Sequence, residues 1–186
     1  LLNLIFGSQI TFYAFLFAPI VLVMIISSKI NSLSASMASF LFFVYSAVTG
    51  VTLSAIFLMY TQESIATTFG ITAGTFGATA LFGYVTKKDL SKMGSILFML
   101  LIGLIIASVV NMFLKNDTMM WILTYVGIVI FVGLTAYDMQ KLKKIAHSID
   151  DDESSIAKFA VLGALTLYLD FINLFLRLLQ IFGKKR

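Results

Sequence analysis

Two aspartates lie inside otherwise apolar segments of the chain. Asp138 occurs in AYDMQKLKK and Asp170 in LYLDFINLF. A charged side chain in a membrane interior costs on the order of 3 kcal/mol or more, so acids in such segments tend to mark ion or proton paths. Two carboxylates that meet in a low-dielectric site tend to share one proton, because like charges so close together cannot both ionise freely. The residue types therefore indicate a proton-controlled ion site.

Asp170 belongs to a polar stripe along its segment. At about 100° per residue of helix, Thr166, Asn173 and Arg177 fall within about 60° of Asp170. The stripe must face protein or water rather than lipid. We predict that these four side chains line an ion path. The alternative is a structural carboxylate, held by Asn173, by Arg177 or by neighbouring backbone.

Asp138 also has a structural alternative, because it lies three residues before Lys141 and could be an interfacial acid at a helix end. If the last span enters the membrane at Lys158, Asp170 lies about 13 Å deeper than Asp138. The two acids can then pair only under one of two conditions. Either the last helix begins outside the bilayer, or the preceding helix continues past Lys141 with its lysines reaching back to the interface.

The composition defines the elements that must position these acids. Hydrophobic residues make up 60% of the 186 residues and charged residues 12%, and the mean hydropathy is +1.00. These values are typical of a membrane protein. Five uncharged runs are long enough for the roughly 20 residues of a membrane-spanning helix. They are Leu1–Ser28, Ile30–Gln62, Ser64–Thr86, Met93–Leu114 and Thr118–Tyr137.

A sixth run, from Ile156 to Ile181, is equally apolar but contains three charged residues, among them Asp170. Lipid offers no partners to backbone groups, and the runs lack the alternation and short length of barrel strands. The sequence therefore predicts an all-α, polytopic membrane helical bundle with six spans, in a single integral membrane domain over residues 1–186.

The third span is rich in small residues. Gly70 and Gly74 form a G-x-x-x-G pair, and Gly77, Ala73 and Ala78 lie nearby. Such residues allow helix backbones to approach closely. We expect ordinary helix packing at this face.

The positions of the lysines predict which ends of the spans face the cytoplasm. With six spans, Lys29, Lys87–Lys92 and Lys141–Lys144 lie on the same side, which the positive-inside rule makes cytoplasmic. The terminal Lys184–Arg186 falls on the opposite side if the last segment crosses completely. A re-entrant last segment is the alternative, and we favour the complete crossing. Because the net charge of +4 comes from span ends, we expect contact with lipid headgroups and no nucleic-acid binding.

Several chemistries are excluded by residue type. The chain has no cysteine and one histidine, His147, so thiol catalysis and a serine–histidine triad are ruled out. The acidic stretch Asp150–Glu153 lacks the spacing and the glycine of a calcium loop. We expect it to be solvated before the last helix, with Ser154 or Ser155 as the cap. We therefore expect no enzyme activity and no cofactor.

GVTLSAIFLMY, GLTAYDMQKLKK and ALTLYLDFINLFLRLLQIFG closely resemble the prokaryotic branch of the transmembrane Bax inhibitor motif family. The resemblance covers nearly the whole chain and is most specific at LYLDFINLF. It implies an all-helical bundle of seven spans with the last one central, so that most of the first span precedes this chain. It also implies location in a bacterial inner membrane.

The resemblance further implies a calcium leak gated by pH through two aspartates, at the positions Asp138 and Asp170, which would bind calcium weakly and transiently. Family members often carry a basic cluster at the start of an early span that engages the acids. This sequence has Asn31–Ser34 there, with only Lys29 nearby.

Three further functions compete with a calcium leak. A noncatalytic regulator of another membrane protein or membrane protease would act through helix contacts, for which small-residue faces are suited. An intramembrane aspartyl protease also pairs two acids, but its Gly-x-Gly-Asp signature is absent, since Leu167–Leu169 precedes Asp170. Unrelated transport is the third. The expected partners are the lipid bilayer, calcium ions and protons, with a membrane-protein partner in the regulator alternative.

Overall fold

The computed structural model describes residues 9–30, 32–148 and 153–186, with side chains from Phe17 onward. The N-terminal Leu1–Ile5, Asn31 of the expected basic region and Asp150–Asp152 of the acidic stretch lie outside the described residues. Every element in the described ranges is an α-helix, which confirms the predicted fold class. The helices are α2 (Gln9–Lys29), α3 (Ala35–Leu53), α4 (Ile56–Met59), α5 (Gln62–Val85), α6 (Ser91–Leu114), α7 (Asp117–Ala146) and α8 (Glu153–Phe182).

Five helical segments are long and apolar enough to cross a membrane: Ala35–Met59, Gln62–Val85, Ser91–Leu114, Asp117–Ala146 and Glu153–Phe182. They correspond to the second to sixth predicted spans. The first of these segments is divided at Ser54, whose hydroxyl donates to the carbonyl of Val51 at 2.6 Å, so that α3 and the short α4 follow one another. The first predicted span corresponds to α2, whose part from Phe17 to Lys29 is a shorter apolar helix.

The chain forms two compact units that share α8. The first contains α2, α3, α4 and α8 up to Leu165, and within it α2 packs beside α3. The second contains α5, α6, α7 and α8 from Thr166. The expectation of one domain stays a prediction, and the candidate site lies entirely in the second unit.

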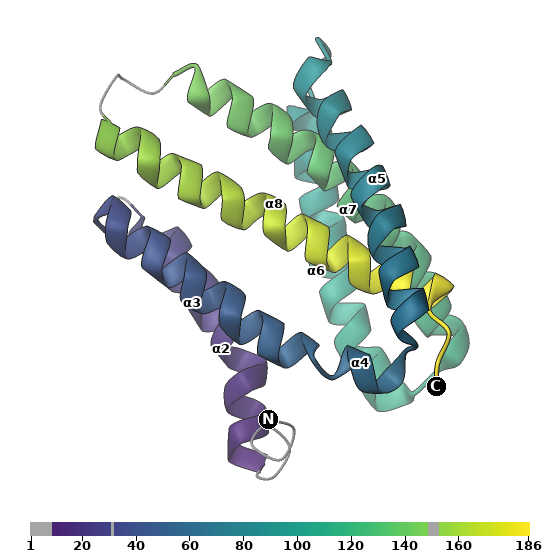
Figure 1. Cartoon of the computed structure of the whole chain (residues 1–186). Helices are drawn as coiled ribbons and strands as arrows, with labels where there is room; N and C mark the ends of the chain where they lie inside the picture. Colours follow the sequence, from purple (N-terminus) through teal and green to yellow (C-terminus); the bar gives the residue numbers. More distant parts are fainter. Residues whose placement is uncertain (1–8, 31, 149–152) are drawn as a thin grey trace. The chain divides into compact units, whose positions relative to one another are not determined.

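Helix α7 packs against both α5 and α6 in the second unit (Figure 1). The core contains apolar side chains of α6, α7 and α8, which are Leu97, Leu104, Leu123, Ile130, Phe131, Leu134, Leu174 and Leu178. The two α8 leucines are four residues apart and therefore lie on one face of that helix. On another side of α8, Phe171 makes edge-to-face contacts with Phe69 and Phe76 of α5.

The expected packing at the small-residue face of α5 is wrong within this chain. A Cβ added at Gly70, Gly74 or Gly77 would meet nothing within 4 Å. The close approach lies further along α5, where a Cβ on Gly83 would overlap with the carbonyl group of Ala136 in α7. The reason is that Gly70, Gly74 and Gly77 lie on an exposed face of α5, whereas Gly83 faces α7.

The connection between α5 and α6 is fixed to α7 by the side chain of Gln140. Its amide nitrogen donates to the carbonyl of Lys88 at 2.8 Å. Its amide oxygen accepts from the backbone N–H of Leu90 at 2.9 Å. Gln140 is buried, so this double hydrogen bond replaces water for all four groups involved.

Two lysines of α7 strengthen the same attachment. Lys143 donates to the carbonyl of Tyr84 at 2.8 Å and lies 4.7 Å from the centre of the Tyr84 ring. Lys144 forms an exposed ion pair with Asp89 at 2.7 Å. The lysine-rich ends predicted to share one side of the membrane, at Lys87–Lys92 and Lys141–Lys144, therefore lie at one end of the second unit. Their cytoplasmic orientation stays a prediction.

Helix α8 begins earlier than the sequence suggested. Its first turn contains Glu153, where a negative charge complements the positive end of the helix dipole. Ser154 and Ser155 consequently lie within the helix, so the expectation that one of them caps it is wrong. Helix α8 then runs without a described break to Phe182. This continuity supports a complete crossing, which stays a prediction.

Candidate functional site

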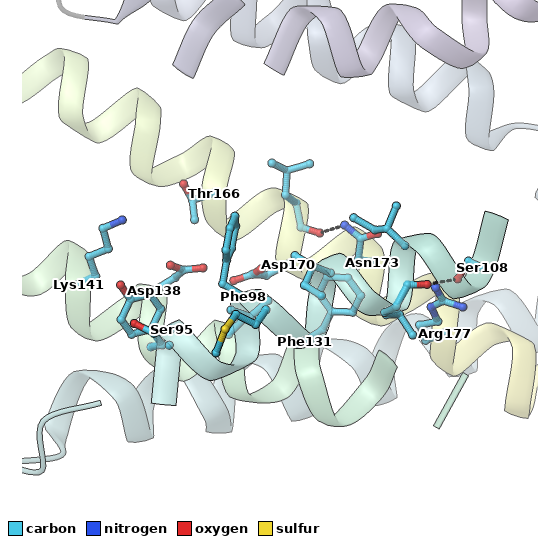
Figure 2. A pocket seen from close by; sticks show the side chains of 18 of the residues that line it. Ser95, Phe98, Ser108, Phe131, Asp138, Lys141, Thr166, Asp170, Asn173 and Arg177 are labelled. Atoms are coloured by element: carbon cyan, nitrogen blue, oxygen red, sulfur yellow. Dashed lines mark hydrogen bonds between the residues drawn. The ribbon is translucent and has the colours of Figure 1, made fainter. Parts of the chain in front are cut away.

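A cavity of about 840 Å³ lies among α6, α7 and α8 in the second unit (Figure 2). Helix α8 lines it with Thr166, Asp170, Asn173 and Arg177, and α7 lines it with Asp138. The structure thus brings all five candidate residues onto one cavity.

The positions of the α8 side chains follow from helix geometry. Asp170, Asn173 and Arg177 are separated by three and four residues, so they share one face. Leu174 and Leu178, each one residue further along, belong to the apolar core instead. Packing of these leucines turns the polar stripe toward the cavity, and Asp170 is consequently only 5% exposed.

The carboxyl groups of Asp138 and Asp170 face one another across the cavity and are within hydrogen-bonding reach (Figure 2). The lengths of the two helices allow this meeting. Helix α7 continues past Lys141 to Ala146, and α8 begins at Glu153, five residues before Lys158. The depth difference inferred from the sequence came from placing the helix ends too close to the acids.

One oxygen of the buried Asp170 carboxyl, Oδ2, has no hydrogen-bond partner among the described residues. Its neighbour is a second carboxyl group, and two ionised carboxylates offer each other only acceptors. A single proton held between Asp138 and Asp170 would supply the missing donor and reduce the buried charge by one. The geometry is therefore suited to a pair that holds one proton and can lose it.

The remaining stripe residues extend the polar lining along α8. The amide nitrogen of Asn173 donates to the carbonyl of Leu169 at 2.8 Å. Arg177 is partly buried and lies against Gly127, where an added Cβ would be 3.0 Å from its Nε. The absence of a side chain at Gly127 therefore leaves room for the guanidinium group. Figure 2 shows Arg177 beside Ser108, away from the two aspartates.

Sequence reasoning missed several lining residues. Lys141 and Tyr137 of α7 reach the cavity beside the acids, and α6 contributes the hydroxyl groups of Ser95 and Ser108. The only signal for the serines is that they are isolated polar residues in an apolar helix. The hydroxyl of Ser108 donates to the carbonyl of Leu104 at 2.7 Å, so its own polarity is satisfied within the helix.

The donor set at the acids is small for a metal ion. Calcium takes six to eight oxygen ligands, whereas the cavity offers two carboxyl groups, the amide of Asn173 and a few hydroxyl groups spread along its lining. In the described part of the chain, no three His, Cys, Asp or Glu side chains group closely enough to hold a metal. Calcium at this place would keep most of its water. Lys29, the basic residue nearest to the position of the family's basic cluster, ends α2 in the first unit.

Comparison with known proteins gives a family. The sequence model of the family described as "Inhibitor of apoptosis-promoting Bax1" matches residues 1–186. The inner membrane protein YbhL of Escherichia coli strain K12 is 53% identical over 186 residues, which is 100% of this chain and 80% of that protein. Its name agrees with the expected bacterial inner membrane.

Two relatives from other bacteria are similar over almost the same length. An uncharacterized protein of Borreliella burgdorferi is 49% identical over 183 residues, or 98% of this chain and 79% of that protein. An uncharacterized membrane protein of Streptococcus pyogenes serotype M1 is 34% identical over 184 residues, or 99% of this chain and 79% of that protein. With these matches, the apolar helices and the LYLDFINLF segment, the chain belongs to the bacterial branch of the Bax inhibitor family of integral membrane proteins.

Proposed function

We propose that this protein is a pH-sensitive calcium leak of a bacterial inner membrane, gated by a proton shared between Asp138 and Asp170. The observation that carries the proposal is the meeting of these two carboxyl groups in a cavity among three membrane helices. Acids in such a place are costly and are kept where ions or protons pass.

The gate follows from the charge of the pair. A shared proton links α7 to α8 through a hydrogen bond and leaves a single negative charge. When the proton is lost, two negative charges repel each other and attract a hydrated cation. Because acid favours the protonated form, the leak is closed at acidic pH and opens as the pH rises.

Two positively charged side chains line the cavity together with the aspartates. Helix α7 contributes the ammonium group of Lys141 and α8 the guanidinium of Arg177, whereas the polar lining of α6 consists of Ser95 and Ser108. The weak donor set is suited to conduction, since an ion must leave as readily as it binds.

The test is calcium flux into proteoliposomes across a pH series, with a monovalent cation for comparison. Asp138→Asn and Asp170→Asn should each flatten the pH response, and the double variant should add little, because the two residues act as a unit. Asp89→Asn is the matched control. It makes the same chemical change at an exposed loop acid outside the cavity, and the pH response should remain.

A second pair of variants tests the stripe. Asn173→Leu should impair conduction, because Asn173 lines the cavity. Leu174→Ala, at a fully buried core position, should mainly lower stability. Equal loss of flux from both would indicate that the stripe is only structural, and absence of calcium flux from correctly folded protein at every pH would overturn the proposal.

The alternative function, a noncatalytic regulator of another membrane protein, is favoured by the outward small-residue face of α5. Gly70, Gly74 and Gly77 are exposed and have nothing within 4 Å of an added Cβ. A partner helix could approach closely there. Such a role would survive neutralisation of both aspartates, which separates it from the leak.

A further inference from the structure

A second cavity, of about 330 Å³, lies beyond the first one along α8. It is lined near the turn between α6 and α7 by Lys115, Asn116 and Asp117, and by Gln180 of α8. Two residues, Ser108 and Arg177, line both cavities. The two cavities therefore adjoin at Arg177 and Ser108.

Arg177 lies two helical turns from Asp170, or roughly 10 Å along the axis. In the described ranges, its guanidinium group forms no ion pair with a carboxylate and donates no hydrogen bond. On the α7 side it lies against Gly127, and Asp117, the acid of α7 that lines the second cavity, forms no ion pair with it in the described part of the chain. An uncompensated positive charge thus stands at the junction of the cavities.

From this geometry we infer that Arg177 is the electrostatic barrier of the leak and determines its rate for cations. The inference rests on the proposed function and adds to it a control separate from the pH gate. A divalent cation that moves between the cavities must pass a fixed charge of its own sign at a partly buried position, where repulsion is stronger than in water. An anion would be attracted to the same point.

Neutralising the barrier should therefore increase conduction. In proteoliposomes, Arg177→Gln should raise calcium flux at least about tenfold at alkaline pH, and Arg177→Lys should keep it near the wild-type rate, because a positive charge remains. The pH dependence should persist in both variants, since the two aspartates are unchanged. Lys184→Gln is the control, because it removes one positive charge just beyond α8 at an exposed position outside both cavities.

A cysteine variant tests the effect of a positive charge at position 177, because the charge can be added chemically to protein that is already folded. The natural chain has no cysteine, so Arg177→Cys offers a single thiol after reconstitution. We expect Arg177→Cys to conduct faster than the wild type. Attachment of a positively charged thiol reagent should return the flux toward the wild-type rate, whereas a neutral reagent of similar size should not.

The outcomes separate the two proposals. If the wild type shows pH-sensitive calcium flux but Arg177→Gln does not exceed it, or if charged and neutral reagents act equally on Arg177→Cys, the barrier is overturned and the gate stands. If neither the wild type nor any variant conducts calcium, the proposed function itself fails. Mass spectrometry provides a readout independent of flux, because a thiol at the junction must be modified by water-soluble reagents, and complete protection would also contradict the inference.

Discussion

The polar groups around the α5–α6 connection have hydrogen-bond partners more completely than those of the cavity. At the connection, Gln140 is bonded through both ends of its amide, and Lys143 and Lys144 have partners as well. In the cavity, one oxygen of Asp170 lacks a partner. The first group holds the helices together, whereas the unsatisfied oxygen of the second costs stability. This difference is consistent with the proposed role of the cavity acids in binding protons and ions.

This comparison predicts that packing at the attached end of α5 is more sensitive than packing at its open face. Gly83→Ala places a methyl group against the carbonyl of Ala136, so we expect a loss of about 3 kcal/mol or more in the free energy of unfolding. Gly77→Ala meets nothing within 4 Å and should be neutral or slightly stabilising, because alanine favours helix. Unfolding in detergent micelles measures both, and equal effects would contradict the assignment of the close contact.

Substitutions at two polar residues should change the free energy of unfolding in different directions. Gln140→Leu leaves the carbonyl of Lys88 and the N–H of Leu90 without their partner, and should lower the free energy of unfolding by about 2 kcal/mol. Asp170→Asn gives the pair a permanent amide donor and limits its negative charge to the one on Asp138, and should leave stability unchanged or increase it. The same unfolding measurement at neutral pH compares them. A large loss from Asp170→Asn would mean that the cavity acid is a structural group after all.

The smallest effect is expected at the exposed ion pair. The hydrogen bond from Lys144, with further ones from Ser91, lowers the pKa of Asp89 from 3.8 to about 2. A lowered carboxyl pKa stabilises the folded state above the unfolded pKa, and that contribution disappears as the pH falls through about 2. Lys144→Gln should raise the Asp89 pKa part of the way back, with little effect on unfolding near neutral pH. Titration of the Asp89 carboxyl by NMR checks this, and an unchanged pKa would show that the ion pair does not form in solution.

The sequence predicted most of this arrangement where a single helix contained the information. Uncharged runs of membrane length predicted the spans. The rotation of about 100° per residue in an α-helix placed Thr166, Asn173 and Arg177 on the same face as Asp170. Prediction was weaker where two helices were involved. The close helix contact at Gly83 depends on the α7 backbone that lies opposite it. The residue pattern of α5 alone does not show which of its glycines faces α7. Helix ends were also missed, because charged residues such as Lys141 and Lys158 can lie inside helices that extend past the apolar run.

The size of the main cavity has a consequence for the kind of discrimination that such a protein can make. A volume of about 840 Å³ corresponds to roughly 28 water molecules at about 30 Å³ each. Calcium, magnesium or another small cation would fit there with its first hydration shell intact. Differences in ionic radius would then hardly be sensed, because a hydrated ion presents water and not its own surface to the walls. Discrimination within the cavity would depend on valence, and ions of equal charge would compete mainly through their abundance.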